Sequence, residues 1–250
     1  MAKSTTVVSL MSSLLLLAAT DCMAAGGSAM ELAPANNDVS DTESLQRGAR
    51  NFMNYCSGCH SAKYVRFNRM GRDLGLTEEQ LIENLMFNAE VPHDTIQRTM
   101  RDEDAIRWFG KPPPDLSVTP RSRGIDYVFN FLQAFYIDPE SPTGVDNVLL
   151  PGTSMPDVLW EMQGYQRAIF TEHEAGDVEL VFERFEAVTE GILSQEDFQT
   201  FVRDTVNFLD YMSEPAQLKR KAIGVWVLIF LAVFLVLAVM LKKQIWKDVS

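Results

Sequence analysis

The chain has 250 residues and a formal net charge of −12 at pH 7, from 34 acidic and 22 basic residues. This acidic balance does not imply nucleic acid as a partner, because nucleic-acid sites gather Lys and Arg. Between two apolar segments at its ends, the chain is long enough for one domain with its own core. The sequence contains no phosphate-binding loop, nucleophile triad or internal repeat.

The first 25 residues predict a signal peptide that is cleaved. An apolar run over residues 10–20 follows the basic residue Lys3, and small residues follow at Ala24 and Ala25, where cleavage would fall. An N-terminal membrane anchor is the alternative, but the run is short for crossing a bilayer. Cys22 would suit a lipoprotein, although the acidic residue before it fits that signal poorly.

A helix is predicted in the segment before Cys56. Residues 41–43, Asp-Thr-Glu, are typical of a helix start. Apolar residues then recur at helical spacing, namely Leu45, Ala49, Phe52 and Met53. Gly48 would let another helix pass closely against this one.

Residues 56–60, Cys-Ser-Gly-Cys-His, match the signature of c-type haem attachment. The thiols of Cys56 and Cys59 would add to the two vinyl groups on one edge of the haem, and His60 would lie beneath the iron as its proximal ligand. A redox-active disulfide does not need His60, and a zinc site would need a second ligand pair. The motif therefore predicts one covalently attached haem c.

A second, short helix is predicted from residue 77. Residues 77–80, Thr-Glu-Glu-Gln, are typical of a helix start, and Leu81, Leu85 and Met86 supply its apolar residues. We therefore expect a mostly helical body with long loops around the haem.

The sixth ligand of the iron must come from elsewhere in the chain. Met155 lies in residues 150–157, Leu-Pro-Gly-Thr-Ser-Met-Pro-Asp, which are too rich in Pro and Gly to be regular. A loop held by Pro151 and Pro156 can present one side chain rigidly, and a thioether ligand raises the potential of the iron. His93, in another loop, is the alternative ligand. Four other methionines are assigned to packing or to the membrane span: Met53, Met86, Met212 and Met240.

Acidic residues gather in the stretch from residue 172 to residue 210. Eleven of them stand against two basic residues, Arg184 and Arg203. The stretch is either a solvated surface or a docking field that speeds encounter with a complementary electron carrier. The sequence leaves both interpretations open.

Within this acidic stretch, two elements are predicted. Residues 180–188 alternate in part and indicate one arm of a β-hairpin. Residues 194–197, Ser-Gln-Glu-Asp, resemble a capping box that opens a helix. One apolar face follows at helical spacing and is assigned to the core: Phe198, Phe201, Val202, Thr205, Val206, Leu209 and Met212.

Residues 222–241 form an uncharged apolar run. At about 1.5 Å per residue, a helix of this length covers a hydrocarbon core of about 30 Å. Three basic residues flank it on each side, so charge does not orient it, but the signal peptide does. We expect an exported haem domain over residues 26–218, a transmembrane anchor over 219–243 and an inside tail over 244–250.

Several stretches besides the haem motif share a pattern with a known family. They are residues 59–70 (CHSAKYVRFNRM), 113–117 (PPDLS), 121–124 (RSRG), 126–129 (DYVF), 142–145 (PTGV) and 154–156 (SMP). Together with the single C-terminal span, they resemble the cytochrome c₁ family, the haem subunits of the cytochrome bc₁ complex. The likeness runs from about Leu45 to Lys247 and is closer to bacterial forms, because residues 107–111 and 161–190 depart from the mitochondrial pattern.

The resemblance implies a role for each matching position. Cys56 and Cys59 would carry the thioether bonds, and His60 and Met155 would be the axial ligands of the iron. This implies a haem whose two axial positions are both filled by protein side chains.

Three further positions are implied around the haem. The carbonyl of Pro114 would accept a hydrogen bond from the other ring nitrogen of His60, which orients the ring and tunes its basicity. Arg123 would meet a haem propionate, and Tyr127 would line the same edge.

The implied fold is mainly α: a class I cytochrome c-like haem domain with long loops and a small β-hairpin, plus one C-terminal transmembrane helix. The implied function is a one-electron carrier that is not an enzyme by itself. It would take electrons from the Rieske iron–sulfur protein and pass them to a mobile or anchored c-type cytochrome. Cytochrome b would be its membrane partner, in a dimeric complex of the bacterial inner membrane with the haem domain in the periplasm.

Two other functions stay open at this point. A stand-alone, membrane-anchored c-type cytochrome would carry the same motif and the same anchor outside any bc₁ complex. A catalytic haem protein such as a peroxidase would need an open or displaceable sixth position at the iron.

Overall fold

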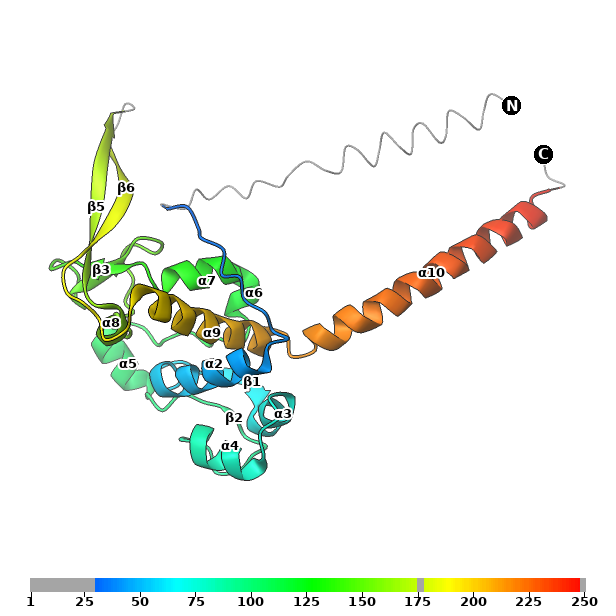
Figure 1. The fold of residues 1–250 in the computed structure, drawn as a ribbon, viewed down its shortest axis with the longest axis horizontal. Helices are drawn as coiled ribbons and strands as arrows, with labels where there is room; N and C mark the ends of the chain where they lie inside the picture. The colour runs from blue at the N-terminus through cyan, green and yellow to red at the C-terminus, as the bar shows by residue number, and fades with distance from the viewer. Residues whose placement is uncertain (1–29, 175–177, 248–250) are drawn as a thin grey trace.

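Two helices, α2 (Thr42–Tyr55) and α9 (Gln195–Ser213), cross at the centre of the body (Figure 1). The protein is described by a computed structural model that covers residues 30–174 and 178–247. The helices meet closely at Gly48, where an added Cβ would lie 2.0 Å from the carbonyl oxygen of Asp204. The expectation that Gly48 lets another helix pass closely is therefore confirmed.

The helix starts predicted from the sequence are confirmed by their caps. The Asp41 side chain accepts the N–H of Ser44 at 3.0 Å at the start of α2, and Ser194 accepts the N–H of Asp197 at 3.1 Å at the start of α9. Helix α4 (Glu78–Leu85) begins after Thr77 with a complete capping box. These bonds satisfy backbone donors that the first helical turn leaves unpaired.

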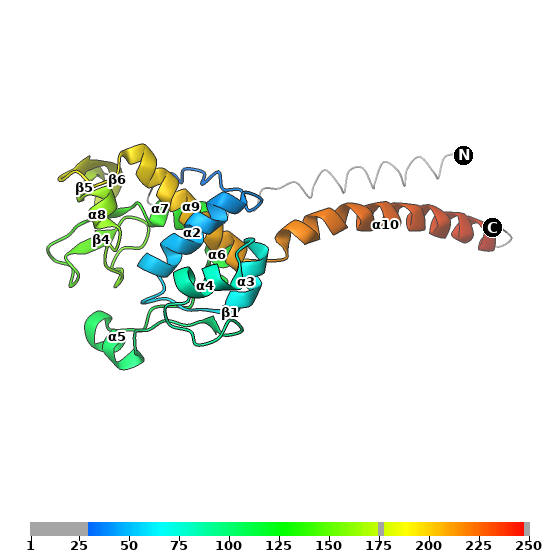
Figure 2. The same ribbon diagram turned by 60° about the horizontal axis from the view of Figure 1, so that its bottom comes forward.

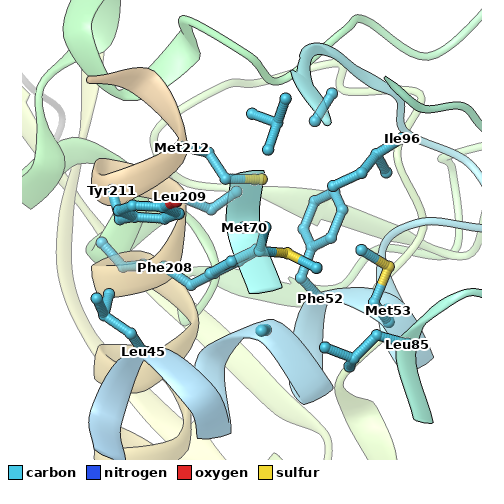
Figure 3. Close-up of a cluster of buried hydrophobic side chains, with 14 of the residues drawn as sticks. Leu45, Phe52, Met53, Met70, Leu85, Ile96, Phe208, Leu209, Tyr211 and Met212 are labelled. Atoms are coloured by element: carbon cyan, nitrogen blue, oxygen red, sulfur yellow. The ribbon is translucent and has the colours of Figure 1, made fainter. Parts of the chain in front are cut away.

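The core lies between α2, α9 and the short helices beneath them. Figure 3 shows Phe52 of α2 and Phe208 of α9 pointing into this cluster, with ring centroids 5.8 Å apart. Met53 and Met212 are buried in it, and so is Met86 at the end of α4. The assignment of these three methionines to packing is confirmed.

The crossing of α2 and α9 also contains buried polar groups. Asp204 of α9 is buried and accepts the hydroxyl of Ser44 at 2.6 Å and the guanidinium of Arg47 at 2.6 Å. Since Asp204 is satisfied inside the fold, it takes no part in an acidic surface. The acidic stretch of residues 172–210 is therefore not one continuous face, although Glu183 and Glu186 of the hairpin are exposed beside Arg184.

The remaining elements of the body are short. The short helices besides α4 are α3 (Phe67–Asp73), α5 (Asp102–Phe109), α6 (Thr119–Arg123), α7 (Ile125–Phe131) and α8 (Trp160–Gln163). The short strands form two antiparallel pairs, β1 (Ala62–Arg66) with β2 (Thr95–Ile96), and β3 (Phe135–Ile137) with β4 (Val145–Asn147). The first pair begins just after the haem motif, and the second ends just before the loop that contains Met155.

A longer antiparallel hairpin stands out from the body (Figure 1). It consists of β5 (Gln166–Glu174) and β6 (Val178–Ala187), with Gln166 opposite Ala187 at its base. The Gln166 side chain donates to the carbonyl oxygens of Gln133 and Phe135, both at 2.8 Å. The predicted hairpin arm at residues 180–188 is confirmed, two residues displaced at its start.

Helix α10 (Gln217–Ile245) projects away from the body in both views (Figures 1 and 2). It is long and apolar enough to cross a membrane, with a mean hydropathy of 3.1 over its most apolar window and none of that window buried. It extends two residues beyond each end of the predicted anchor, 219–243, so the predicted tail begins inside the helix. The fold class, mainly α with a small hairpin and one C-terminal apolar helix, is confirmed. The predicted signal peptide lies outside the described residues.

Candidate haem site

The haem motif continues directly from the end of α2. The N–H of Cys56 donates to the carbonyl of Phe52 at 2.9 Å, and the N–H of His60 donates to the carbonyl of Cys56 at 2.8 Å. These bonds close residues 56–60 into one tight turn, so that both cysteines and the histidine leave the same short segment. Cys56 and Cys59 are free thiols, each half-buried.

The ionisation of the two thiols bears on what they can do. Burial raises the pKa of Cys56 to about 12 and also raises the pKa of Cys59. Disulfide exchange needs a thiolate as the attacking group. Thiols held in the protonated form therefore argue against a redox-active disulfide at this motif.

The ring of His60 is oriented by a main-chain atom far along the chain. Its Nδ1 lies 2.8 Å from the carbonyl oxygen of Pro114, the distance of a hydrogen bond. With Nδ1 engaged, Nε2 is the nitrogen left for a metal. Burial lowers the pKa of His60, which favours the neutral imidazole that metals bind.

The proline loop, residues 113–117, is fastened to the segment that follows the motif. The N–H of Leu116 donates to the carbonyl of Ser61 at 2.8 Å, and Asp115 accepts the N–H of Lys63 at 3.0 Å. Ser117 accepts the N–H of Tyr64 at 3.2 Å. The carbonyl that meets His60 is thus held by strand β1 on the other side of the loop.

Arg98 is a positioning residue that the sequence reasoning missed. Its guanidinium donates to the carbonyls of Pro113 at 2.9 Å and Met100 at 3.2 Å. The main-chain N–H of Arg98 donates to the hydroxyl of Ser61 at 3.3 Å. Its side chain is only 15% exposed. Arg98 therefore joins three segments around His60, but no local pattern distinguishes it from the other arginines nearby.

Met155 lies in a segment that we name the methionine loop, residues 146–157. Met155 is half-buried and packs against the core, and its N–H lies 3.4 Å from the hydroxyl of Thr153. The buried carboxylate of Asp146 accepts the N–H groups of Asn147, Gly152 and Thr153 at 2.8, 2.9 and 3.2 Å. Asp146, which the sequence reasoning also missed, thus sets the shape of the loop that presents Met155.

Arg123 and Tyr127 lie close together at the junction of α6 and α7. The Arg123 guanidinium is 5.8 Å from the centre of the Tyr127 ring, and the Tyr127 hydroxyl donates to the carbonyl of Leu149 at 3.3 Å. Among the described residues, no carboxylate lies within 4 Å of Arg123, whereas its neighbour Arg121 pairs with Glu214 at 3.2 Å. Arg123 is therefore available to an external carboxylate, and Tyr127 contacts the methionine loop.

The alternative ligand, His93, has a different environment. It is exposed in the loop between α4 and β2, and it is not part of the buried cluster against which Met155 packs. This contrast favours Met155 over His93 as a ligand held in a fixed position.

A cavity of about 470 Å³ adjoins the attachment point of the motif. It is lined by residues from the motif, from the loop before α5 and from α5: Gly58, Cys59, Thr99, Met100, Arg101, Asp104 and Trp108. The sequence reasoning did not identify this wall of the site, because the loop before α5 carries no regular pattern.

The residues present fit a covalently attached haem. Two free thiols stand next to an imidazole whose Nδ1 is already bound, and the described residues contain no cluster of three or more His, Cys, Asp and Glu that would hold a metal ion directly. Half-buried Met155 offers a thioether, and Arg123, which has no carboxylate partner among the residues that the structure describes, offers a cation.

Comparisons with known proteins agree with this chemistry. Cytochrome c1 of Allochromatium vinosum is 47% identical over 241 residues, which cover 96% of this chain and 98% of that protein. The ammonia monooxygenase gamma subunit of Nitrosomonas europaea is 37% identical over 223 residues, covering 89% and 91%. Cytochrome c1 of Rhodospirillum rubrum is 25% identical over 229 residues, covering 84% and 83%. The model of the Cytochrome C1 family matches residues 36–249, and the chain belongs to that family.

Proposed function

We propose that the chain is the one-electron carrier subunit of a cytochrome bc₁ complex. It accepts an electron from the Rieske iron–sulfur protein and passes it to a c-type cytochrome. The observation that carries this proposal is the imidazole of His60, already oriented through Nδ1 beside two free thiols; Met155, half-buried against the core, offers the thioether. Family membership supports the same function.

The bound haem would supply an iron that gains or loses one electron. Cys56 and Cys59 would hold the haem by thioether bonds, and His60 and Met155 would be the protein ligands of its iron. Such an iron would have no position left for a substrate. The residues of this site therefore favour a relay over a catalyst.

Two contacts tune that relay. The bond from His60 Nδ1 to the Pro114 carbonyl makes the imidazole a stronger donor, and the thioether of Met155 favours ferrous iron. Arg123 offsets the charge of a propionate, since a guanidinium pairs well with a carboxylate. Tyr127 contacts both Arg123 and the methionine loop, and so links the propionate edge to the ligand loop.

The proposed topology combines α10 as the membrane span with the predicted signal peptide, which gives the orientation. The haem domain, residues 26–218 after removal of the signal peptide, lies in the periplasm, and the C-terminus lies in the cytoplasm of a bacterium. A single helix with no part of its apolar window buried in the described chain supports packing against the helices of cytochrome b. The complex is proposed to be dimeric.

Co-purification tests the subunit assignment. Extraction in mild detergent should give this chain together with a cytochrome b and an iron–sulfur protein, and the reduced spectrum should contain both c-type and b-type haem. A chain that purifies intact and free of both partners would instead be a stand-alone membrane-anchored cytochrome.

One relative, the protein from Nitrosomonas europaea, is named as a subunit of ammonia monooxygenase. No observation on this chain favours an oxygenase, whereas the family model and two of the three relatives reported above point to cytochrome c₁. We therefore propose the relay alone.

The docking interpretation of the acidic stretch stays a prediction. If its exposed carboxylates steer a carrier, the rate of electron transfer to that carrier should change with ionic strength, because salt screens exposed charges. A rate that does not depend on salt would leave these residues as a solvated surface.

A further inference from the structure

A second cavity, of about 330 Å³, lies where the haem domain meets α10. It is lined by Arg69, Arg72 and Asp73 of α3 and by Lys219 in the first turn of α10. Figures 1 and 2 both place α3 beside the start of α10. The cavity thus brings together two elements that are far apart in the sequence and does not include the haem motif.

The charges of this cavity do not cancel. Asp73 pairs with Arg69 at 2.5 Å and also accepts the hydroxyl of Tyr211 at 2.9 Å. Within the described ranges, neither Arg72 nor Lys219 has a carboxylate within 4 Å. Three cations and one carboxylate leave two positive charges facing one cavity.

The position of the cavity relative to the apolar run of α10 indicates which ligands can reach it. Lys219 precedes the uncharged run of residues 222–241 by three residues, which is about 4.5 Å along a helix axis. The headgroup layer on each side of a bilayer is about 5–8 Å thick. If α10 crosses the membrane as proposed above, Arg72 and Lys219 lie at the level of the lipid phosphates.

Neighbouring cations on the same turn differ from these two. Arg220 pairs with Glu214 at 2.5 Å, and Lys221, although exposed like Arg72 and Lys219, does not line the cavity. An ordinary basic flank of a transmembrane helix would attract phosphates at all these positions alike. The cavity adds a feature that such a flank lacks: one cation from α3 and one from α10 converge on it, and neither has a carboxylate partner in the described part of the chain.

We propose that this cavity binds the phosphate headgroup of one anionic phospholipid, which bridges α3 and α10. Arg72 and Lys219 contact the phosphate oxygens, and Arg69, held by Asp73, contributes to the local positive potential. A lipid in this position ties the anchor to the haem domain. The inference rests on α10 being a membrane span, and its readout is independent of electron transfer.

Native mass spectrometry of the full-length, haem-loaded chain tests the proposal. The chain in neutral detergent is titrated with phosphatidylglycerol or with phosphatidylcholine. We expect one tightly retained phosphatidylglycerol and no retained phosphatidylcholine. Arg72→Gln and Lys219→Gln should each weaken retention about fivefold or more, as expected for loss of one charge-assisted hydrogen bond to the phosphate.

Lys221→Gln is the matched control, since it removes the same charge from the same helical turn outside the cavity. Its retention should stay within about twofold of the unchanged chain. Equal weakening by all three variants, or equal retention of both lipids, would overturn the proposal. Displacement of the lipid by millimolar inorganic phosphate would make this a site for free anions and would also overturn it. For each variant, an unchanged reduced haem spectrum verifies that the protein is folded. If Arg72→Gln loses this spectrum, the result for Lys219→Gln tests the proposal by itself.

Discussion

The two sides of the haem site differ in how they are supported. On the histidine side, His60 follows α2 without a break, and main-chain atoms of the proline loop hold its ring. On the methionine side, Met155 stands in an irregular loop whose backbone is held by the buried carboxylate of Asp146. The histidine side therefore depends on the helical core, and the methionine side depends on side chains that hold an irregular loop, chiefly Asp146.

This difference predicts which substitutions would displace each of the two ligands. A substitution that separates α2 from α9 should displace His60 and destabilise the whole domain, since the haem motif continues directly from α2. Damage to Asp146 should release Met155 and leave the attached haem and His60 in place. Three variants, taken in decreasing order of their expected effect on stability, separate the two sides.

The largest effect is expected from Gly48→Ala beneath the histidine side. The new Cβ would lie 2.0 Å from the backbone carbonyl of Asp204, so α2 and α9 must move apart. The free energy of unfolding should fall by about 3 kcal/mol or more, measured by denaturant titration with far-ultraviolet circular dichroism. The control is Gly58→Ala inside the haem motif, where an added Cβ meets nothing within 4 Å. Equal stability of the two variants would contradict the close crossing.

A smaller effect is expected from Asp146→Asn on the methionine side. The amide keeps the shape of the side chain but loses its charge and one acceptor oxygen, which should cost about 2 kcal/mol. The covalent haem should stay attached, and the ferrous form should begin to bind carbon monoxide as Met155 is released. Asp138→Asn, where the carboxylate accepts the N–H of Glu140 at 3.0 Å in a surface turn, should change neither property. Continued exclusion of carbon monoxide by Asp146→Asn would show that the loop does not depend on this carboxylate.

The smallest effect on stability is expected from Arg98→Gln, at about 1 kcal/mol. Loss of the bond to the Pro113 carbonyl should loosen the proline loop and weaken the contact of His60 with Pro114. A less basic imidazole stabilises ferric iron less, so the midpoint potential should rise in a redox titration.

The control for Arg98 is Arg184→Gln on the hairpin. That guanidinium is 53% exposed, does not line the cavity beside the haem motif, and pairs with Glu183 and Glu186, both at 2.6 Å, so the potential should not change. A fall in the potential of Arg98→Gln, or carbon monoxide binding by it, would place Arg98 on the methionine side instead.

Much of this arrangement follows from local patterns in the sequence. The haem motif, the caps at Asp41 and Ser194 and the apolar run of α10 each occupy a few adjacent residues or one regular period, so they are readable without a structure. The close approach at Gly48 was also predictable, because a glycine on the apolar side of a helix has few other uses.

The supports of the two ligands were not predictable in the same way. Arg98 acts on Pro113, fifteen residues away, and Asp146 acts on Gly152 through a loop that has no period. Strands β2 and β4 have two and three residues, too few for alternation to indicate a strand. In each case the signal lies in contacts between separate segments, which a single sequence does not show.

The proposed relay depends most directly on Met155 as the sixth ligand, and the ferric spectrum of the purified haem-loaded protein tests that role. We predict a near-infrared sulfur-to-iron charge-transfer band in the unchanged protein. The band should be absent from Met155→Leu, whose potential should fall and whose ferrous haem should bind carbon monoxide. His93→Gln should keep the band. A high-spin ferric spectrum in the unchanged protein, or a band that persists in Met155→Leu, would contradict the assignment and with it the relay.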